Sequence, residues 1–184
     1  LLMGSTGNSV NKALYGNLNY DPDTDLTPVG IVGQMPNVLL AHKSVAANSI
    51  RELIALSKTN AAGLNFASGG SGTSEHLAAA LFNLKAGTAI AHIPYKGGAP
   101  ATTDLMSGQV QLMFTNQITA ISALQSGNVK VLGTASTTRN KTLPDVPTFA
   151  EQGMSDFLVA VWWGAFGPGN LPPKVVSRLN QAIN

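Results

Sequence analysis

The sequence contains no cysteine, which excludes disulfide bonds, thiol nucleophiles and thiolate metal sites. Charged residues make up only 11% of the 184 residues, and Lys and Arg are scattered singly, so no basic patch for nucleic acid is present. No stretch approaches the roughly 20 apolar residues of a membrane-spanning helix. Apolar residues nevertheless reach 44%, which is enough to build a sizeable core.

The two ends of the sequence look like the interior of a longer chain. Leu1 is not a natural initiator, and residues 1–4 are typical of the end of a buried strand. Residues 175–184 are typical of a helix that continues, and no secretory signal is visible at the start. We therefore expect this sequence to be part of a longer protein.

Short apolar segments alternate with amphipathic segments along the chain. Because helices separate most of the strands, this order predicts parallel pairing, right-handed crossovers and a doubly wound α/β sheet covered on both faces. A capping box at residues 49–52 and paired prolines at 172–173 mark two helix starts. We expect strands over residues 26–32, 37–42, 64–67, 90–93, 110–115, 129–134 and 159–166, and helices over residues 50–63, 76–85, 101–107, 119–126 and from 173 onward.

Four segments fall at the C-terminal ends of predicted strands, where open α/β sheets bind their ligands. All four are rich in Gly, hydroxyl or amide groups, and none contains a carboxylate. This chemistry favours a small anionic ligand held by uncharged donors. The segments are residues 4–9, 68–73, 95–100 and 116–119.

The segment after residue 67 carries the sharpest signal, because it is rich in glycine, follows a strand and opens a helix. Gly69 and Gly72 let the backbone approach a ligand closely, and the N–H groups at a helix start favour an anion. Ser68, Ser71 and Thr73 add hydroxyl donors. A tight turn with a Ser or Thr cap and no ligand is the alternative, and we favour anion binding.

Phosphate-binding and nucleophile motifs are not matched in this segment. A dinucleotide fingerprint would need glycine at Glu75, and no Gly-Lys-Ser/Thr of a P-loop is present. The nucleophile elbow of hydrolases would need glycine where Thr73 stands. A carboxylate ligand is therefore favoured over a triphosphate.

The histidines do not form a metal-binding pattern, so no metal or other cofactor is predicted. His76 lies in the first turn of the helix after the glycine-rich segment, where it either contacts a ligand or packs at the helix start; both readings stay open. His92 lies inside a strand and is interpreted as structural, and His42 is interpreted as solvated.

Two further turns offer ligand contacts. Tyr95 can line a cleft, and the backbone of Gly97 and Gly98 is favoured over the charge of Lys96 as an anion contact. Asn116 either orients a polar ligand or caps a helix, and this alternative also stays open.

Six segments form a combination that is typical of one protein family. They are residues 4–8, 65–78, 92–101, 105–110, 142–153 and 163–168. Together they resemble the receptors of tripartite tricarboxylate transporters, also called Bug proteins. The likeness covers essentially the whole chain.

The resemblance implies a type II periplasmic binding protein fold, with doubly wound, mostly parallel sheets in two lobes joined by crossing strands. It implies that residues 1–39 form part of domain 1, that residues 40–160 form the ligand-binding domain 2, and that residues 161–184 form a hinge strand and the return to domain 1. It also implies a periplasmic receptor, not an enzyme, that captures a tricarboxylate, dicarboxylate, amino acid or aromatic acid. The partner would be a membrane permease.

The resemblance also implies, by matching position, that the ligand contacts are Ser5, Thr6, Ser68, Ser71, Gly72, Thr73 and Asn116. Many relatives carry Asp where Asn116 stands, so this chain has one negative charge fewer at that point. Combined with the residues read from the turns, the expected ligand-binding set is Ser5, Thr6, Ser68, Gly69, Ser71, Gly72, Thr73, His76, Tyr95, Gly97, Gly98 and Asn116.

Two other functions are compatible with the sequence. One is an α/β hydrolase or transferase that uses Ser71, although the sequence offers no evident histidine and acid partner. The other is the ligand-sensing domain of a regulator, which uses the same fold class.

Overall fold

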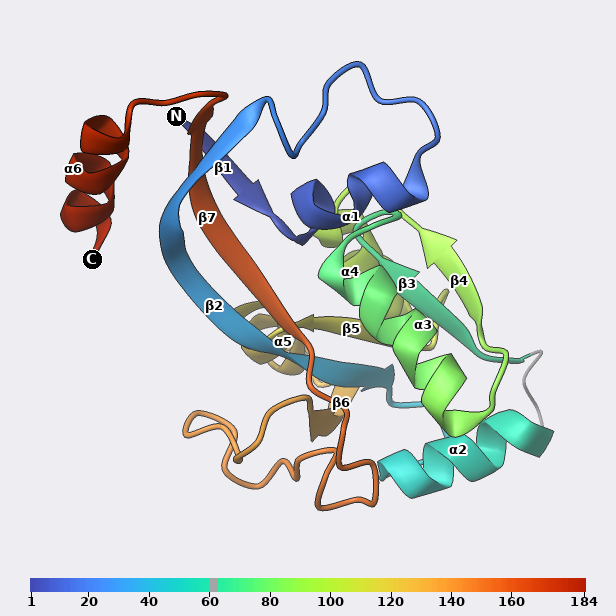
Figure 1. Cartoon of the computed structure of the whole chain (residues 1–184). Helices are drawn as coiled ribbons and strands as arrows, with labels where there is room; N and C mark the ends of the chain where they lie inside the picture. The colour runs from blue at the N-terminus through green and yellow to red at the C-terminus, as the bar shows by residue number, and fades with distance from the viewer. Residues whose placement is uncertain (60–62) are drawn as a thin grey trace. The chain divides into compact units, whose positions relative to one another are not determined.

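The computed structural model describes residues 1–59 and 63–184 and divides into two units (Figure 1). Unit 1 comprises Leu1–Met35 and Val161–Asn184, and unit 2 comprises Pro36–Ala160. Residues 36–39, which the family resemblance places in domain 1, fall in unit 2.

The chain passes from unit 1 into unit 2 within one long strand, β2 (Leu26–His42). It returns at the start of β7 (Ala160–Pro168). The sequence predicts two strands, over residues 26–32 and 37–42, in place of β2. The structure runs one strand through Pro28 and Pro36, and its regular ladder to unit 2 partners begins only at Asn37.

Unit 2 is built on a mixed sheet in the order β6-β2-β5-β3-β4. β3 pairs in parallel with both β4 and β5, as expected from the helical crossovers. β2 runs antiparallel to β5 and β6, because it enters the sheet directly from unit 1 and needs no crossover helix. The strands are β3 (Asn65–Ser68), β4 (Ala91–Pro94), β5 (Leu112–Asn116) and β6 (Val129–Thr134).

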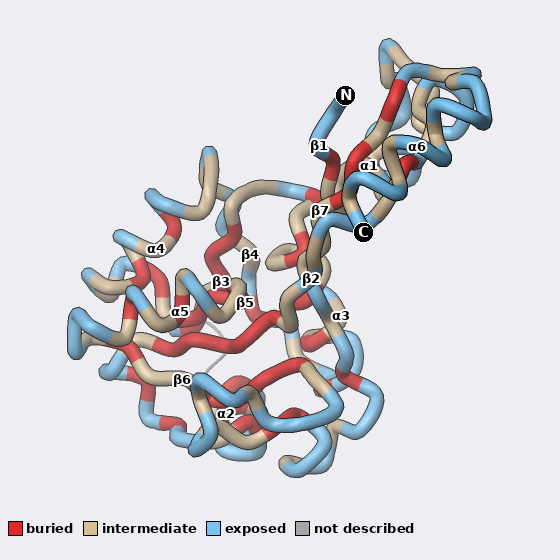
Figure 2. Tube along the Cα trace, turned by 90° about the vertical axis from the view of Figure 1, so that its left-hand side faces the viewer, coloured by how far each residue is buried: buried red, intermediate tan, exposed pale blue. Residues whose placement is uncertain are grey.

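Four helices cover the two faces of this sheet. α2 and α3 pack on one face, around a cluster of five phenylalanines, and α4 and α5 pack on the other. Alternate residues of β2 supply the two faces, since Leu39 belongs to the first core and Leu40 to the second. Figure 2 shows the buried stretches following the strands of unit 2. The helices are α2 (Ile50–Thr59), α3 (Ser74–Ala86), α4 (Gly98–Ser107) and α5 (Gln117–Leu124).

Capping residues set the starts of these helices. α3 begins two residues earlier than predicted, because Thr73 Oγ1 accepts the N–H of His76 as an N-cap. α3 and α4 each end at a glycine in the left-handed conformation, Gly87 and Gly108. The sequence predicts that α2 ends near Gly63. The described part of α2 ends at Thr59, and residues 60–62 lie outside the described residues.

Unit 1 contains β1 (Leu2–Ser5) paired antiparallel with β7, together with α1 (Thr6–Leu14) and α6 (Pro173–Ile183). Pro172 and Pro173 open α6 as predicted. The prediction of a strand at residues 1–4 is confirmed by β1. The prediction that this strand is buried is wrong. Leu1 and Met3 are 79% and 60% exposed, and the strand partner of β1 found among the described residues is β7. The predicted loop 4–9 is instead the end of β1 and the first turn of α1.

Candidate functional site

The glycine-rich turn between β3 and α3 is held by its own hydrogen bonds. Thr73 donates to the Gly70 carbonyl twice, from its Oγ1 at 2.8 Å and from its backbone N–H at 3.4 Å. Three N–H groups expected to bind an anion are therefore already engaged. Their bonds run from Gly69 to Glu75 Oε2, from Gly70 to Ser68 Oγ, and from Gly72 to His76 Nδ1.

Two stacked histidines lie behind this turn. Ser68 Oγ is 2.6 Å from His92 Nε2, and the rings of His76 and His92 stack with centroids 4.1 Å apart. Burial lowers the pKa of His92, and the neighbouring His76 lowers it further. Because the Ser68 side chain is fully buried, it braces the turn from within.

The turn between β4 and α4 packs directly against the first turn. The N–H of Tyr95 donates to the Ser68 carbonyl at 2.9 Å, and that of Gly97 donates to the Gly69 carbonyl at 3.0 Å. The two turns meet so closely that a Cβ atom at Gly69 would lie 3.1 Å from the Gly98 nitrogen. Two of the four segments predicted at the end of the sheet are therefore brought together.

The hydroxyl group of Tyr95 is hydrogen-bonded to a residue of α4. Its hydroxyl donates to Asp104 Oδ2 at 2.7 Å, and burial together with this carboxylate raises the pKa of Tyr95. The side chain thus fixes the turn against α4.

A cavity of about 440 Å³ opens beside these turns, between α4 and α5. That volume is within the range of small-molecule sites. Its wall combines hydroxyl, amide and apolar groups with one carboxylate. The lining residues are Glu75, Gly98, Ala99, Thr102, Thr103, Met106, Thr115, Asn116, Thr119, Ser122 and Ala123.

Two helices begin at this cavity. α4 starts at Gly98, and α5 is capped by Asn116, whose Oδ1 accepts the N–H of Thr119 at 3.0 Å. The first N–H groups of a helix have no acceptor within the helix, and the helix dipole adds positive potential there. The cavity can therefore hold an anion without a basic side chain.

Two hydroxyl groups of the cavity wall already donate to backbone carbonyls of α4. Thr102 Oγ1 donates to the Gly98 carbonyl at 2.9 Å, and Thr103 Oγ1 donates to the Ala99 carbonyl at 3.1 Å. These two hydroxyls retain lone pairs, so they can accept a further bond.

Glu75 lines the cavity, although it was not among the ligand contacts expected from the sequence. Its carboxylate turns back from α3, accepts the N–H of Gly69 and makes a further side-chain hydrogen bond to Thr115. Burial raises the pKa of Glu75, while these two bonds act to lower it. The acidic group in the first turn of α3 was visible in the sequence, but its direction was not.

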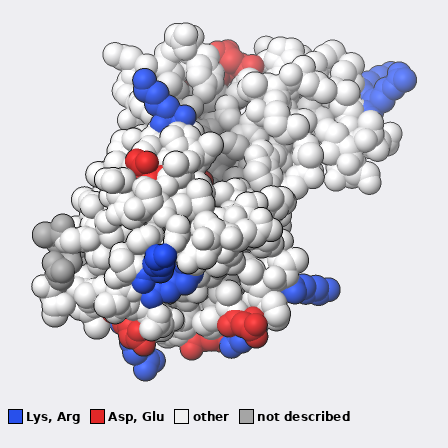
Figure 3. All heavy atoms as spheres, turned by 180° about the vertical axis from the view of Figure 1, so that it is seen from behind, with Lys and Arg blue, Asp and Glu red and all other residues white. Residues whose placement is uncertain are grey.

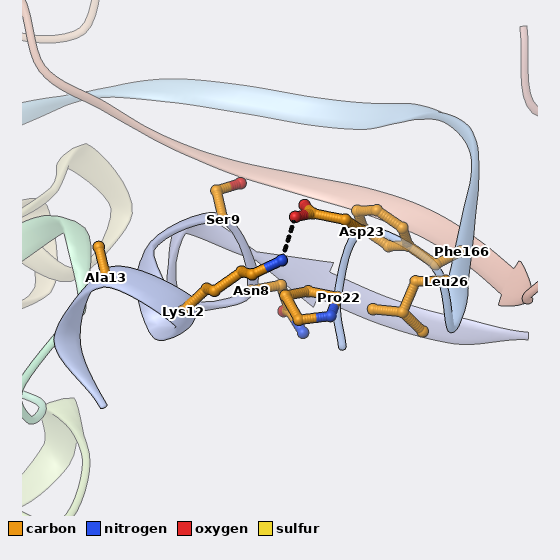
Figure 4. A pocket seen from close by; sticks show the side chains of 8 residues that line it. All are labelled: Asn8, Ser9, Lys12, Ala13, Pro22, Asp23, Leu26 and Phe166. Atoms are coloured by element: carbon orange, nitrogen blue, oxygen red, sulfur yellow. Dashed lines mark hydrogen bonds and ion pairs between the residues drawn. The ribbon is translucent and has the colours of Figure 1, made fainter. Parts of the chain in front are cut away.

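Unit 1 has a cavity of its own, of about 560 Å³, shown in Figure 4. Its cation is Lys12, whose Nζ lies 2.6 Å from Asp23 and 3.0 Å from Asp21. Because these carboxylates already neutralise Lys12, this cavity is the poorer place for an anionic ligand. Ser5 and Thr6 belong to this unit: the N–H of Ser5 donates to Asn8, and Thr6 Oγ1 is buried without a partner among the described residues.

Metal and nucleic-acid sites find no support in the part of the chain that the structure describes. No group of three or more His, Cys, Asp or Glu residues is placed to hold a metal ion there. Basic side chains are spread singly over the face drawn in Figure 3. Among the same residues, no helix is long and apolar enough to cross a membrane.

The model of the tripartite tricarboxylate transporter family receptor matches residues 1–184. The chain belongs to this receptor family. The resemblance stated from the six sequence segments is thereby confirmed, and so is the type II periplasmic binding fold.

Relatives in this receptor family include a protein from the tcbD-tcbE intergenic region of Pseudomonas sp. (strain P51). It is 37% identical over 185 residues, which cover 100% of this chain and 55% of the relative. The chain thus spans about half the length of the curated relatives that it matches.

Two solved structures of similar proteins carry bound acids. MatC from Rhodopseudomonas palustris, with bound malate, is 34% identical with a TM-score of 0.88, over 98% of this chain and 62% of that chain. Another R. palustris protein, with adipate, is 31% identical with a TM-score of 0.90, over 98% of this chain and 61% of that chain.

The predicted receptor residues fall into four groups. Gly98 and Asn116 line the cavity of unit 2. Ser71 is exposed on the glycine-rich turn, and Ser5 and Thr6 belong to unit 1. The remaining seven form the two packed turns behind the cavity, namely Ser68, Gly69, Gly72, Thr73, His76, Tyr95 and Gly97.

Proposed function

We propose that this chain is the ligand-binding part of an extracytoplasmic receptor that captures a small carboxylate. The observation that carries the proposal is the unit 2 cavity, where α4 and α5 both begin at a wall without Lys or Arg. The printed ligands of the two R. palustris relatives, malate and adipate, support this class of ligand.

Binding of a carboxylate in this cavity needs no catalysis. The first-turn N–H groups at Gly98 and at the start of α5 donate to the ligand carboxylate, and the helix dipoles add favourable potential. Asn116 uses its Oδ1 for the cap, which leaves its NH₂ group as a donor for the ligand. Ordered water can bridge the remaining distances at little loss of affinity.

We further propose that the receptor works in the periplasm and delivers its ligand to a tripartite tricarboxylate-type membrane permease. Membership of the receptor family supports this role. A hydrolase that uses Ser71 is the weaker alternative. The Ser–His contacts found in the described residues join Ser68 to His92 and Ser44 to His42, and neither involves Ser71, which is exposed. A sensing domain would use the same cavity.

Thermal unfolding of the full-length protein that carries this chain tests the proposal. A ligand that binds only the folded state stabilises it by about 2.7 kcal/mol at roughly a hundredfold excess over its Kd. Mono-, di- and tricarboxylates, amino acids and aromatic acids form the panel. A rise of the midpoint with one class supports the receptor, and unchanged midpoints with every acid would reject it.

A further inference from the structure

The cavity of unit 2 contains one feature that a plain carboxylate receptor does not need. Among its lining residues, Glu75 is the charged one, and it carries a negative charge into a site for anions. None of the ion pairs found in the described residues involves Glu75. Within the part of the chain that the structure describes, the Glu75 carboxylate therefore has no cation as partner.

The two carboxylate oxygens of Glu75 have different surroundings. Oε2 accepts the N–H of Gly69, at the base of the glycine-rich turn. Oε1 faces the start of α4, since a Cβ atom at Gly98 would lie 3.9 Å from it. One oxygen thus braces the turn, while the other lies beside the helix start that would hold a ligand carboxylate.

Charge complementarity follows from this arrangement. A second ligand carboxylate beside Glu75 would be repelled, because like charges a few ångström apart in a partly buried site interact strongly. A ligand ammonium would supply the cation that Glu75 lacks, and hydrogen bonds between charged groups are the stronger ones. The same cavity offers N–H groups for a carboxylate and the apolar surface of Met106 and Ala123 for a side chain.

We propose that Glu75 is a specificity-determining residue that selects acids carrying an ammonium group, with the ligand carboxylate at the starts of α4 and α5 and the ammonium at Glu75. This inference rests on the proposed carboxylate receptor and narrows its ligand class to zwitterionic amino acids. An ammonium beside Glu75 favours the charged carboxylate, and so opposes the burial that raises the pKa of Glu75.

Calorimetric titration of the full-length protein with matched acid pairs tests the proposal. The pairs differ only in the amino group: L-aspartate and succinate, L-glutamate and glutarate, L-leucine and 4-methylpentanoate. Wild type is expected to bind one amino acid at least tenfold more tightly than its partner acid. Glu75→Gln keeps an acceptor for Gly69 but removes the charge, so this preference should fall at least tenfold, or about 1.4 kcal/mol.

Glu52→Gln is the matched control variant. Glu52 also lies in the first turn of a helix of unit 2, and its Oε2 also accepts a backbone N–H, from Asn48 at 2.7 Å. It does not line the cavity. The preference of this variant for amino acids should equal that of wild type.

A measurement on wild type covers the case in which Glu75→Gln fails to fold. Titrations in buffers of different ionisation enthalpy, at a pH where Glu75 is partly protonated, report proton exchange. An amino acid should release protons from Glu75, and its partner acid should not. Proton uptake with a dicarboxylate would instead show that Glu75 binds it in the neutral form, which overturns the proposal.

The outcomes separate this inference from the proposed function. If wild type binds acids of a pair equally, or prefers the one without the amino group, the selection by Glu75 is wrong and the receptor stands. If no acid of any pair and no other carboxylate binds, the receptor proposal fails and this inference fails with it.

Discussion

Substituting Gly69 by alanine tests whether the two turns behind the cavity meet as described. A Cβ atom at Gly69 would lie 3.1 Å from the Gly98 nitrogen, 3.2 Å from Glu75 Oε2 and 3.3 Å from the Gly97 carbonyl carbon. Two of these neighbours are backbone atoms, which cannot move aside as a flexible side chain can. Overpacking of this kind typically costs about 1–3 kcal/mol, so we expect Gly69→Ala to lower the free energy of unfolding by that amount.

Gly98→Ala is the control for the same substitution in the adjoining turn. Its Cβ atom would meet Glu75 Oε1 at 3.9 Å, an ordinary contact, and Gly98 already lies in helix α4. Alanine at a compatible position stabilises a protein by about 0.4–1 kcal/mol through the unfolded chain. Urea unfolding of the full-length protein measures both variants. If Gly69→Ala is as stable as Gly98→Ala, the close approach of the two turns is refuted.

Three further predictions concern titration and packing. Burial raises the pKa of Glu75 in the folded protein, so its contribution to stability is present below the unfolded pKa of about 4.3 and is lost as pH rises through the folded pKa. Glu75→Gln should therefore have a higher thermal midpoint than wild type at pH 7 but not at pH 4. Equal midpoints of the two proteins at both pH values would contradict this prediction. The folded pKa of His92 is lowered, so its contribution is present above the unfolded pKa of about 6.5 and is lost as pH falls through the folded pKa. His92→Gln should flatten the loss of thermal midpoint between pH 7 and pH 5, and an unchanged slope would speak against it. Phe114 is fully buried and stacks at 5.6 Å on Phe66, so Phe114→Ala should cost about 3–5 kcal/mol in urea unfolding, and a loss below 1 kcal/mol would argue against the packed cluster.

Local sequence signals were sufficient for most of the element order. Hydrophobic periodicity and caps predicted the helix–strand alternation of unit 2, and strand β6 (Val129–Thr134) has its predicted bounds. These signals depend on residues a few positions apart, so they are readable without tertiary contacts. The continuity of β2 was not predictable in this way, because a proline is tolerated in a strand wherever no ladder partner needs its N–H.

The glycine-rich turn could be placed from the sequence, but the use of its N–H groups could not. Whether they bind a ligand or close on the protein depends on where Glu75, Ser68 and His76 direct their side chains. The partner of Ser68 is His92, which comes from the next strand and is brought close only by the parallel pairing of β3 and β4. The ligand-binding roles of the predicted residues therefore stay predictions.

The wall between α4 and α5 was predicted only in part. Gly98 and Asn116 were found because they stand at strand ends and helix starts. Thr102 and Ser122 lie inside helices, where a hydroxyl gives no sign that a cavity adjoins it. The packing of two helices over the sheet creates that cavity, and no local pattern encodes it.

The central claim is that the unit 2 cavity binds the carboxylate, and filling the cavity tests it most directly. Ala99 is exposed and lines the cavity in the first turn of α4, whereas Ala80 is exposed on α3 and does not line it. Calorimetry with the tightest acid on the full-length protein should show that Ala99→Trp weakens binding at least a hundredfold, or about 2.8 kcal/mol, while Ala80→Trp binds as wild type does. If Ala99→Trp binds the acid with wild-type affinity, the ligand lies elsewhere and the account of this cavity is wrong.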